Sequence, residues 1–289
     1  MPRGVPKAGF RRTKKRMAAA VLSDVSTPVS KDTNETDAQI WEKISDRFEV
    51  LEQLTKASIK GISRSLVVSG PAGLGKSFTV EKMLREWDPE EKKHIIIKGY
   101  VKATGLYKML YQYRHKNNVI VFDDSDTIFN DETALNMLKA VCDTTERRQV
   151  SYLADYKMVD EDSANTIPNT FTFEGSVVFI TNLDFHSLID RGHKIACHLQ
   201  ALMSRSHYVD LAMKTRRDYI VRIRQVIKQG LLKNRVSELE SARVMKFIEN
   251  NSDSLTELSL RVPIKISDLM RSSPNSWEKI AKVTMFKVK

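Results

Sequence analysis

Cysteine and histidine are scarce in this chain of 289 residues, which contains two of the first and six of the second. Cys142 and Cys197 fall in segments with ordinary helical patterning, so we expect two reduced core thiols of an intracellular protein and no disulfide. His193 and Cys197 lie four residues apart on an expected helix, but no second pair of ligands follows at metal spacing. A zinc site is therefore not expected, and no Ser-His-Asp or Cys-His arrangement stands out.

Long apolar runs are also absent. No stretch of the sequence approaches the roughly eighteen residues that mark a membrane-spanning helix. Near the N-terminus, an apolar run follows the basic residues only over 17–22, which is too short for the apolar part of a signal peptide. We therefore expect no membrane segment, no membrane partner and a cytoplasmic location.

Acidic residues are missing from positions 1–16, where seven basic side chains gather. Residues 210–289 carry 17 Lys and Arg against 9 Asp and Glu, whereas residues 17–209 have a net charge of −4 within a total of +11. Basic ends around a neutral middle favour a polyanionic partner, most simply DNA, over a solubilising tail with solvated helix faces. The expected nucleic-acid contacts of the arm are Arg3, Lys7, Arg11, Arg12, Lys14, Lys15 and Arg16.

Three regions follow from the pattern along the chain. Residues 1–35 are typical of a basic, disordered arm, because charge and Ser, Thr, Asp, Asn and Pro dominate there. Over 36–211, short apolar runs alternate with helix patterns, as in a parallel sheet covered on both faces. After residue 211 the strand signal ends, so we expect 212–289 to form a small all-helical domain.

The expected elements of the middle region can be placed by number. A capping box of Thr36 and Gln39 opens a helix that runs toward Lys60. Further helices are expected over 76–87, 104–115, 131–142 and 187–203, and strands over 66–69, 94–98, 119–122, 177–181 and 207–211.

A glycine-rich segment, G-P-A-G-L-G-K-S, lies between the first expected strand and the helix that follows it. It fits the pattern G-x-x-x-x-G-K-[ST], in which glycines turn successive N–H groups around phosphate oxygens and the next helix adds its positive end. Lys76 would reach the β- and γ-phosphates, and the Ser77 hydroxyl would ligate Mg²⁺. The predicted ATP-binding residues are Gly70, Pro71, Ala72, Gly73, Leu74, Gly75, Lys76, Ser77 and Phe78.

Polar residues end two later strands. Asp123 and Asp124 follow the apolar run 119–122, and carboxylates at a strand end beside a phosphate loop are suited to hold Mg²⁺ and to polarise water. Asp123 would hold the metal and Asp124 the attacking water, with Asp126 in the same cluster. Asn182 ends the strand 177–181, where its amide would orient the water. A helix-capping loop is the alternative interpretation of the acidic run.

The order of these motifs resembles that of the AAA+ ATPases over roughly residues 37–289. The resemblance implies Walker A at 70–77, Walker B at Asp123 and Asp124, and a sensor 1 asparagine at Asn182. It also implies an arginine finger at Arg205 that reaches a neighbouring subunit's nucleotide. Arg261, which Pro263 places in the first turn of a helix starting near residue 259, matches the sensor 2 arginine.

The same resemblance implies a fold and an assembly. The fold would be an AAA+-like, parallel five-stranded αβα P-loop core followed by a small all-α lid domain. The assembly would be a homo-oligomeric ring, typically a hexamer. The small size and basic arm are also similar to those of phage-encoded ATPases, which would place the protein in the host cytoplasm.

Two features point toward more specialised relatives. Walker B is Asp-Asp where the family usually has Asp-Glu, and an Asp-Asp pair with a sensor asparagine is similar to the superfamily 3 helicases. Residues 149–173 resemble a hairpin that projects into the pore of several AAA+ DNA motors, although acidic residues dominate its loop. Residues 99–102, with an aromatic and a cation, are a second pore-loop candidate.

These observations predict an ATP-hydrolysing ring that acts on DNA in replication or recombination, with a protein partner from those processes. Three alternatives remain open. The first is a helicase or clamp loader that uses ATP as an assembly switch, and the second is a protein remodeller. The third is a DNA-coating protein with a largely structural nucleotide site.

Overall fold

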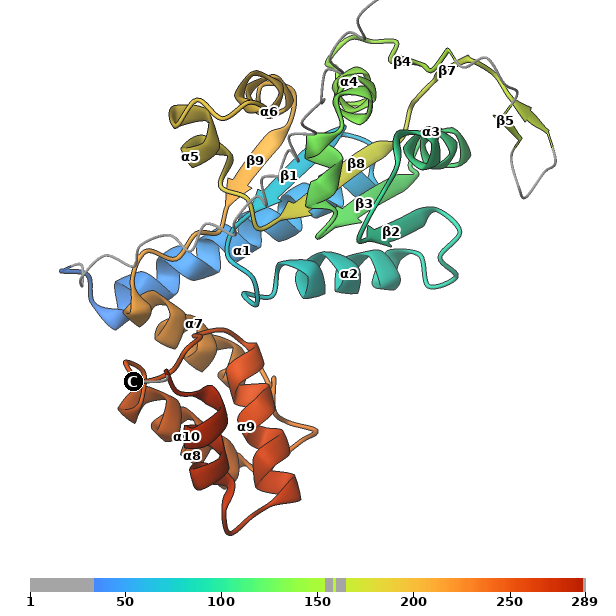
Figure 1. The fold of residues 1–289 in the computed structure, drawn as a ribbon. Coiled ribbons are helices and arrows are strands. Elements are labelled where there is room, and N and C mark those ends of the chain that lie inside the picture. The colour runs from blue at the N-terminus through green and yellow to red at the C-terminus, as the bar shows by residue number, and fades with distance from the viewer. Residues whose placement is uncertain (1–33, 154–157, 160–164, 288–289) are drawn as a thin grey trace, which may run out of the picture.

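The computed structural model describes residues 34–153, 158–159 and 165–287 (Figure 1). The seven basic residues expected to contact nucleic acid, from Arg3 to Arg16, lie outside the described residues, as does almost all of the expected arm.

A five-stranded parallel sheet forms the centre of the fold, with the strand order β2-β3-β8-β1-β9. Strands β1, β2, β3 and β8 are runs of mainly apolar residues, and β1, β3 and β8 are buried throughout, as strands covered on both faces must be. This arrangement confirms the expected α/β fold and places the acidic strand β3 beside β8. The strands are β1 (Ser65–Ser69), β2 (His94–Lys98), β3 (Val119–Asp123), β8 (Ser176–Thr181) and β9 (His207–Asp210).

Helices cover the two faces of the sheet in separate layers (Figure 1). Alternate strand residues point to opposite faces, so Val68 packs in one apolar cluster with α1 and α2, while Val67 packs in another with α3, α4, α5 and α6. The bounds are α1 (Asp37–Ile59), α2 (Lys76–Trp87), α3 (Ala103–Gln112), α4 (Glu132–Val141), α5 (Phe185–Asp190) and α6 (Ala196–Met203). A short 3-10 helix, η1 (Asp126–Asn130), follows β3.

Two expectations about this region are wrong. The helix expected over 187–203 is two helices, because Gly192 takes a left-handed φ of 64° that ends α5. Cys197 is not a core thiol but is exposed, since α6 turns Leu199 and Leu202 toward the core instead. Cys142 is buried, and burial raises the pKa of its thiol to about 11.

The segment 149–173 contains two antiparallel strand pairs. β4 (Gln149–Ser151) pairs with β7 (Thr170–Thr172), and further out β5 (Met158–Val159) pairs with β6 (Thr166–Ile167). The base of this extension is anchored by Tyr107, whose hydroxyl donates to Pro168 O at 2.8 Å and whose ring lies 5.0 Å from that of Phe171. The acidic residues of its expected loop, Asp155, Asp160, Glu161 and Asp162, lie outside the described residues.

The C-terminal region consists of helices, drawn in orange and red in Figure 1. These helices have an apolar cluster of their own. They are α7 (Arg216–Lys228), α8 (Glu238–Asn250), α9 (Arg261–Ser272) and α10 (Trp277–Met285). α9 begins at Arg261, two residues beyond the expected start, and keeps Pro263 in its first turn. Within the described residues, no helix combines the length and apolar character needed to cross a bilayer.

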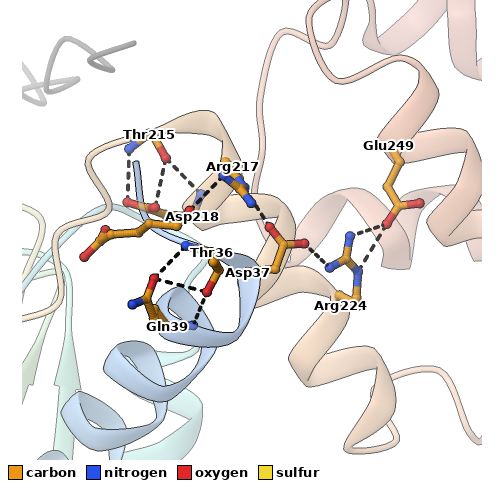
Figure 2. A network of polar contacts seen from close by, with 9 residues as sticks. Thr36, Asp37, Gln39, Thr215, Arg217, Asp218, Arg224 and Glu249 are labelled. Carbon is orange, nitrogen blue, oxygen red and sulfur yellow. Dashed lines mark hydrogen bonds and ion pairs between the residues drawn. The ribbon is translucent and has the colours of Figure 1, made fainter. Parts of the chain in front are cut away.

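A polar network joins the start of α1 to the C-terminal helices (Figure 2). The Asp37 carboxylate accepts hydrogen bonds from Arg217 Nε at 2.6 Å and Arg224 Nη1 at 2.8 Å, and Arg224 also pairs with Glu249 at 2.7 Å. The two arginines hold the pKa of Asp37 below its usual value. Because Arg217 and Arg224 lie two turns apart on α7, the network ties the first turns of that helix to the start of α1.

Candidate nucleotide-binding site

The loop between β1 and α2 has the backbone shape that a phosphate site requires. Gly73 and Gly75 take left-handed φ values of 72° and 97°, and Gly75 is the N-cap of α2. A Cβ on Gly73 would lie only 2.7 Å from the Cβ of Ser259, so glycine is needed there for space as well as for conformation. The first N–H groups of α2 therefore face the loop with no side-chain cap, ready for an anion.

A cavity of about 770 Å³ opens over this loop. Its walls come from the loop itself, α1, α2, α7 and the start of α9, so the core and the C-terminal helices both contribute. This volume is in the usual range for small-molecule sites. The predicted binding residues from Ala72 to Phe78 line it, whereas Gly70 and Pro71 form the start of the loop and do not.

Lys76 is buried at the bottom of the cavity, with 5% of its surface exposed. Its ammonium donates to Gly70 O, to Pro71 O at 2.9 Å and to Asn182 Oδ1 at 2.8 Å. Burial lowers the pKa of Lys76 to about 8, against the opposing effect of nearby carboxylates, Asp124 foremost. Carbonyl and amide oxygens thus hold a cation that lacks a full counter-charge, and phosphate oxygens would supply one.

Ser77 and Asp123 meet at the edge of the same cavity, where the Ser77 hydroxyl donates to Asp123 Oδ1 at 2.7 Å. Hydroxyl and carboxylate oxygens are the donors that Mg²⁺ prefers, and the ion usually takes only one or two protein ligands beside phosphates and water. The pair therefore fits a nucleotide-bound Mg²⁺. In the part of the chain that the structure describes, no group of three or more His, Cys, Asp and Glu side chains is placed to hold a metal by itself.

Lys98 also contacts Asp123, a feature that the sequence reasoning missed. Its ammonium lies 3.3 Å from Asp123 Oδ2 and donates to Glu81 Oε1 at 2.5 Å. The contact follows from the pairing of β2 with β3, which sets Lys98 opposite Asp123. The sequence alone does not give that register. In the sequence, Lys98 is notable only as the residue before the pore-loop candidate at 99–102.

Asn182 connects the lysine to the second Walker B carboxylate. Its amide oxygen accepts from Lys76, while its Nδ2 donates to Asp124 Oδ1 at 2.8 Å. Asp124 is exposed and takes a left-handed φ of 51°, an uncommon conformation outside glycine. Asp126 lies behind this group, accepts from the Thr181 hydroxyl at 2.5 Å, and has its pKa raised to about 6, chiefly by burial.

The two predicted arginines lie in different places. Arg261, at the start of α9, lines the cavity. Arg205 does not line it: this residue follows α6 and precedes the edge strand β9, at the opposite end of the strands. There its guanidinium lies 3.6 Å from Asp143 and donates to Ala201 O at 2.8 Å. Phe78, with 71% of its surface exposed, forms part of the cavity wall.

The described residues thus form an α/β fold with a five-stranded parallel sheet and a phosphate-loop motif, with a nucleotide-sized cavity at the carboxyl ends of its strands. An uncharacterised 36.7 kDa protein of the nrdC-mobD intergenic region of Enterobacteria phage T4 is 35% identical to the chain over 273 residues, which cover 93% of this chain and 83% of the phage protein. The chain belongs to the same family as that phage protein. No protein-family model matches it.

Solved structures similar to the chain include domain III of the replication initiation protein DnaA from Thermotoga maritima. That domain is 12% identical, with a TM-score of 0.48, over 84% of this chain and 92% of the domain's chain. NtrX from Brucella abortus in complex with ATP is also 12% identical, with a TM-score of 0.44 over 85% of this chain. The chain spans about half the length of NtrX, at 51%.

Proposed function

We propose that the chain is an AAA+ ATPase that binds ATP in the cavity and hydrolyses it with Mg²⁺. The observation that carries the proposal is the position of Asn182, whose amide contacts both Lys76 and Asp124 beside the Ser77–Asp123 pair. A loop alone would support binding of a triphosphate. Hydrolysis of the triphosphate is supported by the groups gathered beside the loop: a lysine, a hydroxyl, two carboxylates and an amide.

Backbone N–H groups of the loop and the Lys76 ammonium would carry out the phosphate-binding step. The N–H groups of residues 73–77 and the start of α2 would hold the phosphates, and Lys76 would exchange its carbonyl partners for phosphate oxygens. Because the anion favours the charged form, we expect the pKa of Lys76 to rise from about 8 when ATP binds.

The hydrolytic step uses the residues at the ends of β3 and β8. Ser77 and Asp123 would hold Mg²⁺, which when bound neutralises charge on the phosphates. Asp124 is the exposed carboxylate of the cluster and would orient the attacking water, with Asn182 fixing the direction of the Asp124 side chain. Arg261 would stabilise charge on the transferred phosphate from the same subunit.

Arg205 would act in a neighbouring subunit. Its position beside an edge strand, away from its own cavity, favours a role across an interface in a homo-oligomeric ring, a hexamer by family resemblance. Before it could reach a neighbour's nucleotide, its guanidinium would have to leave Asp143. Hydrolysis would then depend on assembly.

DNA in replication or recombination is the proposed target, with a partner protein from those processes and the host cytoplasm as location. The basic arm and the 17 Lys and Arg among residues 210–289 support this proposal. Similarity to superfamily 3 helicases gains no support from the comparisons and forms no part of it. The segment with β4 to β7 is the proposed pore-facing hairpin, and deletion of residues 1–16 should weaken DNA binding and flatten its salt dependence.

A second candidate is a loader or assembly switch that turns over ATP slowly. Asp124 favours it, because aspartate is one methylene shorter than the usual glutamate and is already hydrogen-bonded to Asn182. A shorter, restrained carboxylate would hold water less well while leaving ATP binding unchanged.

The experiment is ATP hydrolysis by the full chain, with and without single- and double-stranded DNA. Lys76→Ala should abolish turnover, and retained activity would refute the phosphate-loop assignment. Arg205→Ala should also be inactive but should still bind ATP. If Arg205 acts across an interface, mixing the two inactive variants should restore part of the ATPase activity. If Arg205 does not act across an interface, no mixture should restore activity.

A further inference from the structure

Arg222 is a buried cation that contacts the phosphate loop and lines the cavity over it. It lies on α7, and only 6% of its surface is exposed. Its Nε and Nη2 both donate to Leu74 O at 3.3 Å, and its Nη1 donates to Gln225 Oε1 at 2.7 Å. A Cβ on Gly75 would lie 3.5 Å from Nη2, so the guanidinium is in van der Waals range of the loop backbone.

The charge of Arg222 has no acidic partner among the residues that the structure describes. The guanidinium instead lies over the ring of Phe48, 3.5 Å from its centroid. Burying an unpaired charge is costly, and burial lowers the pKa of Arg222 to about 10. Because Arg222 also lines the cavity over the phosphate loop, phosphates bound there would supply the missing counter-charge.

Residues of the C-terminal helical region donate hydrogen bonds to two consecutive carbonyls of the phosphate loop. Leu74 O accepts from Arg222, and Gly73 O accepts from the Leu260 N–H at 2.8 Å, just before α9. Behind Arg222 the contacts continue, because Gln225 Nε2 donates to Ser45 Oγ on α1 at 2.6 Å. The loop, α7 and α1 are therefore joined through the side chains of Arg222 and Gln225.

We propose that Arg222 is a nucleotide-sensing positioning residue: the bound phosphates are its counter-charge, so that nucleotide binding draws α7 and the helices attached to it onto the phosphate loop. Two physical effects support this. Phosphate held in the cavity brings negative charge close to the guanidinium, which lines the same cavity. Hydrogen bonds from the loop N–H groups to phosphate also polarise the peptide units of the loop, which makes Leu74 O a stronger acceptor for Arg222.

The chain offers a closely matched control for this proposal. Arg148 is 5% exposed, donates to two backbone carbonyls, Val141 O and Gly175 O, both at 2.8 Å, and lies over the ring of Phe173. It does not line the cavity. Arg148→Met and Arg222→Met therefore remove the same kind of buried group, and only one of them lies beside the loop.

The first measurement is the affinity of the full chain for a fluorescent ATP analogue, with the folded fraction of each variant determined separately. We expect Arg222→Met to weaken binding about tenfold, because the favourable interaction of one buried charge with the phosphates is lost. Arg222→Lys keeps the charge and should recover part of the loss. Arg148→Met should bind the analogue as tightly as the wild type does. If Arg148→Met does not fold, Arg148→Lys serves as the control instead.

The second measurement follows the helices themselves. Cys197 is exposed, whereas Cys142 is buried with a raised thiol pKa, so a spin label on Cys197 and a second on Leu239→Cys, at a position 76% exposed on α8, would report the distance between core and C-terminal helices. ATP should shift this distance in the wild type and in Arg148→Met. In Arg222→Met the distance should no longer respond, even when ATP is added to saturation.

The inference rests on the proposed nucleotide site, and the two can fail separately. If Lys76→Ala abolishes analogue binding while Arg222→Met and Arg148→Met behave alike in both measurements, the inference about Arg222 is overturned and the nucleotide site stands. If the wild type binds no nucleotide, or Lys76→Ala binds as well as the wild type, both are overturned. The inference about Arg222 is supported if Arg222→Met alone loses about tenfold in affinity for the analogue and shows no change in spin-label distance when ATP is added.

Discussion

The buried ammonium of Lys76 should cost the empty protein stability, and the cost should disappear at high pH. Burial lowers the pKa of Lys76 from 10.5 to about 8, and the side chain is 5% exposed, so little solvent screens the effect. A shift of that size corresponds to about 3 kcal/mol of free energy of unfolding. Lys76→Met removes the charge while keeping most of the buried stem.

The sign follows from proton binding. Below pH 8 both the folded and the unfolded chain carry the proton, so the full penalty of burying the charge applies. Between pH 8 and 10.5 the unfolded chain binds more protons at this site than the folded one, and the stability of the wild type therefore rises with pH relative to the variant. Above pH 10.5 the side chain is neutral in both states and the difference is constant.

The assay is urea unfolding of both proteins without nucleotide at several pH values from 7 to 11, comparing the difference in free energy of unfolding. Other titrating groups cancel in that difference, and the hydrogen bonds that the neutral amine still makes, which the variant lacks, add an offset that does not change with pH. The wild type should gain about 3 kcal/mol on Lys76→Met across the window. A difference that stays flat with pH would show that the site does not penalise the charge, and the reasoning about an uncompensated cation would be refuted.

Three further outcomes are expected. Asp124→Asn should bind ATP as the wild type does but lose about 100-fold in turnover, because the amide cannot polarise water, and a steady-state rate near that of the wild type would remove Asp124 from the mechanism. Gly73→Ala should weaken ATP binding and lower stability by more than about 1 kcal/mol, since the new Cβ meets Ser259 in a left-handed backbone; a melting curve like that of the wild type would contradict this. Asp37→Asn should cost about 1 kcal/mol at low salt and less at 1 M NaCl, because the pairs with Arg217 and Arg224 are partly exposed, and an effect that does not change with salt would argue against an ionic origin.

Much of the core could be predicted because its signals are local in the chain. The strand before Gly70, the glycines of the loop and the helix after Lys76 form one continuous pattern, and the capping box at Thr36 and Gln39 marks the start of α1. Asp123 and Asn182 were placed together correctly because residues at the ends of neighbouring parallel strands must meet at one edge of the sheet.

The rest depended on contacts between distant segments. Lys98 reaches Asp123 only through the register of β2 and β3, and Arg222 reaches Leu74 only through the angle at which α7 leaves the core. Neither residue stands out in the sequence, since both lie among ordinary helix or strand neighbours. Gly192 is a local signal for the break between α5 and α6, but a lone glycine within a helical pattern does not always end the helix.

The hydrogen bonds to Gly73 O and Leu74 O make the phosphate loop part of the sheet-containing core and of the C-terminal helical region at the same time. Its backbone hydrogen bonds are completed by Leu260 and Arg222, residues that are nearly forty positions apart and that both follow the last strand of the sheet. The amides of the loop and of α7 should therefore exchange with solvent deuterium in a single opening event rather than in two. The nucleotide site then exists only while both halves of the chain are folded, which ties ATP binding to the integrity of the whole protein.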